Sequence, residues 1–286
     1  MNASRILGRI ITILFLAIYA LWIIIPVMWI VSLMFKTYGE WRSPDLLPHN
    51  PTLDNILMLF SPQSISTFIA YTAVIEPITM PFLRSLLIAF STTIVSVIIG
   101  LFAAYGASRY NSPGFSTLFF TLLTRMLPPA TFVTPLMVYY STLHLLDNLV
   151  GLILLYSATN VVYAIWILKG FIDNIPREWE EAALLEGASP LGALFRVIIP
   201  IARPGIVVAG LFIFLLSWTE LLFALVLTNI NAVTLPVQIS KYVTGVGPLY
   251  GVQAAAAVIS SILPVTIGYL IQRHLVTGFT FGMVRA

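Results

Sequence analysis

Uncharged apolar runs much longer than a β-strand recur along the chain, and the first extends from Ile10 to Phe35, between Arg9 and Lys36. A helix that crosses about 30 Å of hydrocarbon needs roughly 20 apolar residues. A strand of a membrane barrel needs only about 9–11 residues and alternates apolar and polar side chains. Because the runs lack this alternation, they predict transmembrane α-helices.

Six segments are long and apolar enough to cross a membrane. We predict spans over 10–35, 85–108, 115–143, 149–168, 205–228 and 254–271, which make residues 1–286 one all-α transmembrane domain. The third segment is interrupted by Arg125, Pro128, Pro129 and Pro135. A chain with 59% hydrophobic and 9% charged residues fits this class, since a soluble domain carries about 25% charged residues.

The distribution of lysine and arginine predicts that both termini are cytoplasmic, the side on which these residues concentrate. With the N-terminus inside, the cytoplasmic ends and loops hold Arg5, Arg9, Arg109, Lys169, Arg177, Arg196, Arg203, Arg273 and Arg285. The outer loops hold only Lys36, Arg42, Arg84 and Lys241. The first apolar run is longer than the core of a signal peptide, which has about 7–15 residues, so we expect a retained first helix.

Sequence motifs for catalysis, nucleotide binding and metal binding are missing from the chain. It has no Gly-x-x-x-x-Gly-Lys-Ser/Thr loop for phosphates and no Gly-x-Ser-x-Gly nucleophile motif. It has no cysteine, and His49, His144 and His274 each lack a second ligand at metal-binding spacing. We therefore expect no catalytic residue, no metal and no directly bound cofactor.

The 169–203 segment differs from the other loops because it is strongly charged and carries helix-boundary residues of its own. Pro176 suits a first helical position, and Gly187 suits the left-handed residue that closes a helix. Ser189 and the proline after it suit the start of a second helix, which we expect to end at Pro200. The sequence predicts a short helix, a glycine turn and another short helix.

Within this segment Glu181-Ala182-Ala183 is followed, after three residues, by Gly187 and then by Phe195-Arg196 and Ile199-Pro200. This pattern resembles the EAA loop of permease subunits of binding-protein-dependent ABC importers. Similarity to the carbohydrate branch, and most closely to the maltose-type second permease, extends over about 83–286. It includes Pro128-Pro129, Leu145-Leu146-Asp147-Asn148, Ser217-Trp218-Thr219-Glu220, Leu235-Pro236 and the tail from Gly278 to Ala286.

The resemblance implies the type I ABC importer permease fold and a role as half of an alternating-access pathway for a sugar or oligosaccharide. It implies four kinds of partner: a second related permease, two ABC ATPases that use ATP and Mg²⁺, an extracytoplasmic solute-binding protein, and membrane lipid. In that family the EAA loop is a coupling helix that docks on the ATPase. The matching residues here are Glu181, Ala182, Ala183, Gly187, Ala188, Ser189 and Pro200.

Two charges, Arg125 and Glu220, fall at membrane depth, where ionisable groups are rare and often functional. Counting from the preceding turns at about 1.5 Å per residue places them at similar depth. One interpretation is that both line the translocation path with Trp218 as an aromatic platform. The other is a buried structural ion pair between two helices. The sequence leaves both open.

The segments Lys36–Arg84 and Asn229–Gln253 are expected to face outward and to meet the binding protein. The first contains an apolar stretch from Ile65 to Ile78. The second corresponds in position to a loop that reaches the binding protein in maltose-type transporters, and its candidate docking residues are Gly245, Gly247, Pro248 and Tyr250. Import of another polar solute, such as a polyol or glycerol phosphate, remains an alternative, and an ion-driven secondary transporter is a weaker one because we find no internal repeat.

Overall fold

The computed structural model describes residues 3–61, 76–244 and 247–283, with side chains described for 8–61, 76–243 and 247–272. The chain forms two compact units, one from residues 1–79 with 238–262 and one from 80–237 with 263–286. Within the described residues, five helices are long and apolar enough to cross a membrane, at 8–34, 79–110, 149–173, 190–218 and 250–272. Four of them cover predicted spans almost fully, and the helix at 190–218 overlaps only the first part of the predicted 205–228 span.

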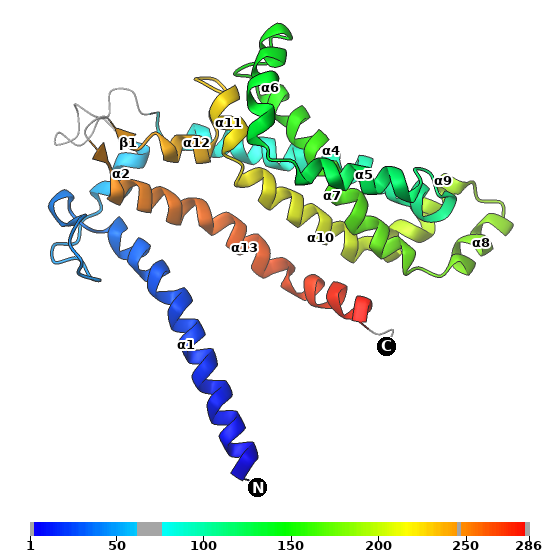
Figure 1. Cartoon of the computed structure of the whole chain (residues 1–286), viewed down its shortest axis with the longest axis horizontal. Coiled ribbons are helices and arrows are strands. Elements are labelled where there is room, and N and C mark those ends of the chain that lie inside the picture. The colour runs from blue at the N-terminus through cyan, green and yellow to red at the C-terminus, as the bar shows by residue number, and fades with distance from the viewer. Residues whose placement is uncertain (1–2, 62–75, 245–246, 284–286) are drawn as a thin grey trace. The chain divides into compact units, whose positions relative to one another are not determined.

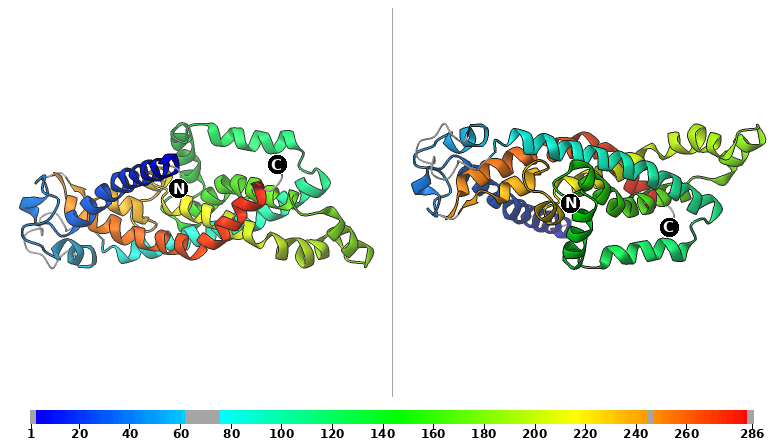
Figure 2. Two further views of the ribbon diagram at one scale, coloured as in Figure 1. Left: turned by 90° about the horizontal axis from the view of Figure 1, so that it is seen from below. Right: turned by 90° about the horizontal axis from the view of Figure 1, so that it is seen from above.

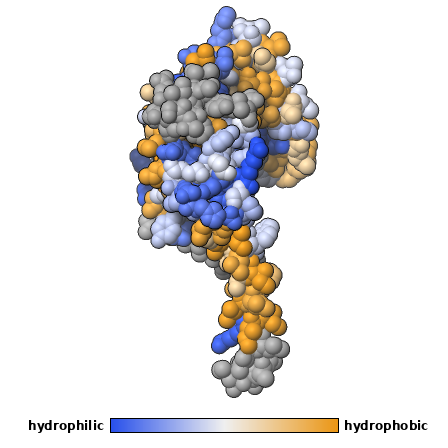
Figure 3. Space-filling model, turned by 90° about the vertical axis from the view of Figure 1, so that its left-hand side faces the viewer, coloured by the Kyte–Doolittle hydropathy of each residue, from blue (hydrophilic) through white to orange (hydrophobic). Residues whose placement is uncertain are grey.

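The first unit is built around the end of its long N-terminal helix (Figure 1). Its elements are α1 (Ala3–Met34), η1 (Tyr38–Glu40), α2 (Asp54–Phe60), the antiparallel strands β1 (Val243–Thr244) and β2 (Gly247–Pro248), the last residues of α12 (Leu235–Ser240) and the first part of α13 (Tyr250–Met283). Every residue from Gly8 to Met28 is exposed, and Figure 3 shows the apolar surface of this helix. A helix that is apolar on all sides requires lipid or other helices around it.

The C-terminal end of α1 is fixed by side chains of the segment that follows. Asn55 Nδ2 donates to the carbonyl oxygens of Met34 (2.9 Å) and Lys36 (2.8 Å), and Trp41 Nε1 donates to the Lys36 oxygen (3.1 Å). These bonds satisfy carbonyls that a helix end leaves without an intrahelical partner. The helix therefore ends in an ordered cap.

The second unit contains the remaining helices, which Figure 1 and Figure 2 show from three sides. They are α4 (Thr79–Tyr110), α5 (Phe115–Met126), α6 (Ala130–Thr142), α7 (Leu149–Asp173), α8 (Arg177–Leu185), α9 (Pro190–Ala193), the π-helical turn η4 (Leu194–Ile198), α10 (Ile199–Trp218) and α11 (Leu222–Leu227). Buried residues of α4, α7, η4 and α10, among them Ala104, Leu168, Ile198 and Ala209, form one core cluster. This core holds the ends of the helices that carry α8 and α9.

Two predicted spans are broken in the structure. The 115–143 segment consists of α5 and α6, separated at Leu127, whose extended backbone (ψ 137°) is the conformation favoured before a proline. The 205–228 segment is divided into α10 and α11 after Trp218. Pro135, in contrast, lies inside α6.

The predicted helix end at Pro200 is wrong. Pro200 is the second residue of α10, which continues to Trp218 and contains Pro204 as well. A proline disrupts an α-helix because it lacks an N–H and its ring meets the carbonyl one turn earlier. The π-helical turn η4 directly precedes α10, and its wider spacing of carbonyls accommodates the ring. Pro176 lies one residue before α8, at the N-cap, and not at the first helical position.

Candidate functional site

The turn between α8 and α9 has the geometry that the sequence predicts. Gly187 has a φ of +90°, the left-handed conformation that glycine adopts without a Cβ clash. Its N–H donates to the Leu184 oxygen (3.0 Å), and the Ala188 N–H donates to the Ala183 oxygen (3.0 Å). This pair of bonds is a Schellman motif. Ser189 Oγ then caps α9 by accepting from the Gly192 N–H at 3.1 Å.

Three of the candidate coupling residues lie on α8, and two of them are on its exposed surface. Glu181 and Ala182 are exposed, whereas Ala183 is partly buried. Leu185, at the end of α8, is 89% exposed, and Trp179 is 54% exposed. Two large apolar side chains are thus exposed beside the charged residues of α8. Neither Leu185 nor Trp179 was among the residues predicted from the sequence.

The opposite face of α8 carries a buried charge. Glu180 Oε2 lies 2.7 Å from Arg109 Nε, and each side chain is only 6% exposed. The other Glu180 oxygen accepts a hydrogen bond from the Tyr105 hydroxyl, whose oxygen also lies 3.1 Å from the Pro190 oxygen of α9. The end of α4 thus contacts both short helices.

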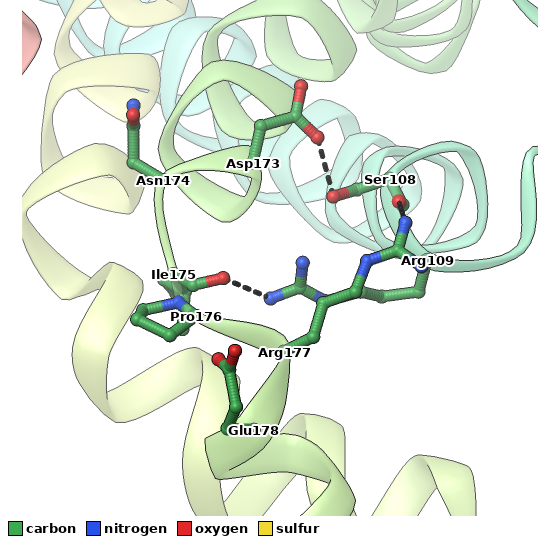
Figure 4. A pocket seen from close by; sticks show the side chains of 8 residues that line it. All are labelled: Ser108, Arg109, Asp173, Asn174, Ile175, Pro176, Arg177 and Glu178. Carbon is green, nitrogen blue, oxygen red and sulfur yellow. Dashed lines mark hydrogen bonds between the residues drawn. The ribbon is translucent and has the colours of Figure 1, made fainter.

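A second group of bonds joins the end of α4 to the link between α7 and α8 (Figure 4). Arg177 donates to the Ser108 carbonyl oxygen (3.2 Å), and Arg109 donates to the Ile175 carbonyl oxygen (2.9 Å). Ser108 Oγ donates to Asp173 Oδ1 at 2.6 Å. The pocket of about 610 Å³ between these residues is polar. Each guanidinium group donates to a backbone carbonyl oxygen across this pocket, so the two arginines connect α4 with the link between α7 and α8.

The intramembrane charges Arg125 and Glu220 have separate partners. Glu220 accepts from the Tyr156 hydroxyl and from the N–H groups of Phe223 (2.9 Å) and Ala224 (3.1 Å), so it caps α11. The Arg125 guanidinium lies 4.9 Å from the centre of the Tyr163 ring. Among the described residues no ion pair joins the two charges.

Trp218, the third candidate of this group, is buried with 4% of its surface exposed. Its ring stacks on Phe214 at 5.8 Å and meets the edge of Phe82 at 5.4 Å. Such aromatic contacts are typical of a packed core. In this chain Trp218 therefore does not present an open face to a solute.

Asp147 binds the loop that follows α11. Its carboxylate accepts the N–H groups of Asn229 (2.9 Å), Ile230 (3.1 Å), Asn231 (2.9 Å) and Ala232 (3.0 Å). Burial raises the pKa of this carboxyl, but the backbone N–H donors outweigh burial and lower the pKa to about 2. From the sequence, Asp147 is notable only as part of the 145–148 motif, and its contact with the 229–232 loop is not predictable from neighbouring residues.

Of the candidate docking residues near the β-hairpin, Gly247, Pro248 and Tyr250 are described. Gly247 has a φ of +128° and pairs with Thr244, and Pro248 pairs with Val243. Tyr250, at the start of α13, is 40% exposed. Gly245 and most of the 65–78 stretch lie outside the described residues.

Comparisons with known proteins agree with this arrangement. The family described as "Binding-protein-dependent transport system inner membrane component" matches residues 96–280. The trehalose transport system permease protein SugB of Mycobacterium tuberculosis is 35% identical over 269 residues, 92% of both chains. The sulfoquinovosyl glycerol transport system permease protein SmoH of Agrobacterium fabrum is 32% identical over 263 residues, 90% of this chain and 87% of that protein.

A third relative, the trehalose/maltose transport system permease protein MalG of Thermococcus litoralis, is 28% identical over 285 residues, 99% of both chains. Among solved structures, one chain of a bacterial ABC transporter involved in the import of the acidic polysaccharide alginate superimposes with a TM-score of 0.74. The two chains are 21% identical, and the match covers 96% of this chain and 98% of the other. This similarity confirms the predicted permease fold.

Proposed function

Because the chain belongs to the family of inner membrane components of binding-protein-dependent transport systems, we propose that it is the permease subunit of an ATP-driven importer of a sugar or oligosaccharide. As a member of this family it is a multi-pass protein of the cell membrane. It forms half of an alternating-access pathway, and a second related permease forms the other half.

The names of the relatives support a glycoside as the solute. They specify trehalose, sulfoquinovosyl glycerol, and trehalose or maltose, which share a sugar ring with several hydroxyl groups. A second candidate class is a small polar osmolyte such as a polyol, because GgtD of Synechocystis, 33% identical over 208 residues, is named for the uptake of osmoprotective compounds. Measuring the uptake of solutes from both classes distinguishes the two candidate functions.

ATP hydrolysis is assigned to two partner ATPases, which also hold the Mg²⁺, because the sequence lacks a phosphate-binding loop. The observation that carries the docking assignment is the closed turn at Gly187 with Leu185 89% exposed beside it. An ordered turn with an exposed apolar side chain suits insertion into a groove of a partner. The proposed docking surface also includes residues close to Leu185 in the sequence, namely Glu181, Ala182, Ala188 and Ser189.

The contacts of the three intramembrane candidates support different roles. Glu220 and Trp218 have intramolecular partners that fit a structural role. Arg125 has the Tyr163 ring, and its Nε is buried without a hydrogen-bond acceptor among the described residues. Arg125 is therefore the strongest of the three for the solute path, and Arg125→Lys is expected to lower uptake more than Thr124→Ser.

The hairpin of β1 and β2, with the exposed Tyr250 after it, is assigned to the solute-binding protein. In this hairpin Gly247 pairs with Thr244, and Pro248 pairs with Val243. Tyr250→Ala is expected to weaken stimulation of the ATPase by the binding protein without reducing ATPase association.

The function is tested with the complete complex of both permeases, the two ATPases and the binding protein in proteoliposomes. Uptake of radiolabelled trehalose, maltose, glycerol and glycerol 3-phosphate identifies the solute class. Leu185→Glu is expected to reduce co-purification of the ATPase at least tenfold, while Leu47→Glu, at a site 68% exposed before α2, retains it. Full ATPase association in Leu185→Glu, or ATP-independent uptake, contradicts the proposal.

A further inference from the structure

We propose that Glu180, Arg109 and Tyr105 form a positioning cluster that makes the 169–203 segment move as one body with the end of α4. The inference rests on the proposed function, since it concerns how motion of the docked segment reaches the membrane helices. None of the three residues is part of the exposed docking face of α8. Their role is to transmit its motion.

The connectivity of the chain explains why such a cluster is needed. The α8–α9 unit is joined covalently to α7 and α10, whereas Tyr105 and Glu180 are 75 positions apart in the sequence. Apart from polar bonds, α4 is connected to this region by apolar packing of residues such as Leu101 and Ala104 against Ile172 and Leu194. Apolar contacts have no preferred direction, so they permit sliding.

The hydrogen bonds and the ion pair between α4 and the 169–203 segment prevent the sliding that apolar packing alone permits. Arg109 reaches from α4 to Glu180 and to the Ile175 oxygen, and Arg177 reaches back to the Ser108 oxygen. Ser108 lies in the last turn of α4, where carbonyls have no intrahelical partner. Because donors run in both directions, neither element moves along the other without breaking charge-assisted hydrogen bonds.

Tyr105 extends the cluster across the glycine turn. Its hydroxyl oxygen contacts Glu180 on α8 and the Pro190 oxygen on α9. The single hydroxyl proton is donated to one of these acceptors at a time, and the side chain of Tyr105 lies against both short helices on either side of Gly187. A displacement of either helix is therefore transmitted to α4.

Stability alone does not account for a buried ion pair at this position. Desolvation of two charges offsets most of their attraction, and apolar replacements are often as stable. The same principle makes the loss of one partner severe, because the other charge remains buried. A fixed geometry between α4 and α8 is the property that this pair supplies.

The test uses the complete transporter complex in proteoliposomes with its binding protein, [¹⁴C]trehalose and ATP. Glu180→Gln is expected to keep the ATPase bound at wild-type stoichiometry but to lower trehalose taken up per ATP hydrolysed at least tenfold. Tyr105→Phe, which retains the ion pair, is expected to lower this ratio about threefold. The double variant Glu180→Arg with Arg109→Glu restores opposite charges and recovers part of the ratio. Glu178→Gln, an exposed carboxylate on the same helix, serves as the matched control.

A wild-type transport ratio in Glu180→Gln, or loss of the ATPase as complete as in Leu185→Glu, overturns the proposal. A chemical tether gives an independent test, because the sequence contains no cysteine. Ser108→Cys with Asp173→Cys replaces a pair bonded at 2.6 Å, and a short bifunctional thiol reagent then joins α4 to the 169–203 segment. If the two move as one body, ATP hydrolysis by the tethered complex stays within twofold of the untreated complex.

Arrest of hydrolysis by the tether contradicts movement as one body. This measurement needs no sugar, so it also decides the inference if the wild-type complex does not transport trehalose. In that case the solute assignment fails, while the tether still reports whether α4 and the 169–203 segment separate during ATP hydrolysis.

Discussion

Gly100 of α4 faces Ala164 of α7 so closely that a Cβ on Gly100 would lie 2.4 Å from the Ala164 Cβ and 3.1 Å from the Ala164 carbonyl carbon. Ala164 is fully buried. Small residues at a crossing let two helix backbones approach closely, and packing of this kind drives helix association in membranes. The Gly100–Ala164 contact therefore sets the distance between α4 and α7 at a point on α4 that precedes the positioning-cluster residues Tyr105 and Arg109.

Gly100→Ala is expected to destabilise the protein by about 1–3 kcal/mol, because overpacking forces side chains and backbone apart. Ala164→Gly in the same chain removes the clashing methyl and is expected to restore part of the loss. Gly210→Ala is the control, since its Cβ would meet only Thr93 Cγ2 at an ordinary 3.6 Å. Thermal unfolding in detergent measures all three. Equal melting temperatures for Gly100→Ala and Gly210→Ala contradict the close contact.

Gly187→Ala is expected to strain the turn between α8 and α9 by about 1–2 kcal/mol, the cost of a left-handed conformation in a residue with a Cβ. Apart from the neighbouring residues in the chain, no atom of the described residues lies within 4 Å of the added Cβ, so the effect acts through the backbone. Gly187→Asn is expected to be milder, because Asn adopts this conformation more readily. The measurement is ATPase co-purification together with the melting temperature.

Gly170→Ala is the matched control for the Gly187 variants. Its added Cβ also has no atom within 4 Å, but Gly170 lies inside α7, where alanine is favoured over glycine by about 0.5–1 kcal/mol. We expect Gly170→Ala to preserve or raise stability. Similar losses in both variants would show that the backbone conformation of Gly187 is not the cause.

The features that were predictable from the sequence depend on local chemistry. Ser189 caps α9, and Gly187 closes α8 in a left-handed conformation, because both depend on residues within one helical turn. The five long apolar helices of the described residues follow from hydropathy over about 20 residues. The helix end predicted at Pro200 was the exception, because the π-helical turn before it accommodates the proline ring and the helix continues.

The features that were missed depend on contacts between distant residues. Glu180 and Glu181 are adjacent glutamates that the sequence alone does not distinguish. A rotation of about 100° per residue along the helix places Glu180 against α4 and Glu181 on the exposed face. The only sequence signal for Glu180 was its i, i+3 and i+4 alignment with Arg177 and Leu184. Asp147 likewise gained its role from a loop more than 80 positions away.

Glu220→Ala is expected to be more destabilising than Tyr156→Phe. The alanine variant removes the cap of α11 and leaves the Tyr156 hydroxyl, on a side chain that is 2% exposed, without its acceptor. An unsatisfied buried donor costs about 1–3 kcal/mol, and a lost cap costs about 0.5–2 kcal/mol. Tyr156→Phe removes the hydroxyl itself, so no buried donor is left without an acceptor. The comparison is made by thermal unfolding in detergent.

Thr219→Ala controls for this pair of variants, because the exposed Thr219 hydroxyl donates to the Leu215 oxygen of its own helix (2.8 Å). We expect a melting temperature within about 2 °C of wild type, in keeping with a surface change below about 0.5 kcal/mol. A loss in Glu220→Ala no greater than in Thr219→Ala would refute the structural role of the Glu220 carboxylate.

We predict that the Asp147 carboxylate makes a pH-dependent contribution to the stability of the fold. Its pKa is about 2 in the folded chain, below the usual 3.8. A lowered pKa means that the ionised form is favoured by folding, so the contribution is fully present above pH 3.8 and is lost as the pH falls towards 2. Asp147→Asn is expected to lower the melting temperature at pH 7, where the charge strengthens the N–H bonds.

The difference between wild type and Asp147→Asn should therefore shrink as the pH falls from 5 to 3, which we would follow by thermal unfolding in detergent at each pH. Asp54→Asn, an exposed residue in the first turn of α2, is the control and should show no comparable convergence. A difference for Asp147→Asn that is constant over this range would mean that the carboxylate acts through its shape and not through its charge. The 229–232 loop would then be held equally well by a neutral acceptor.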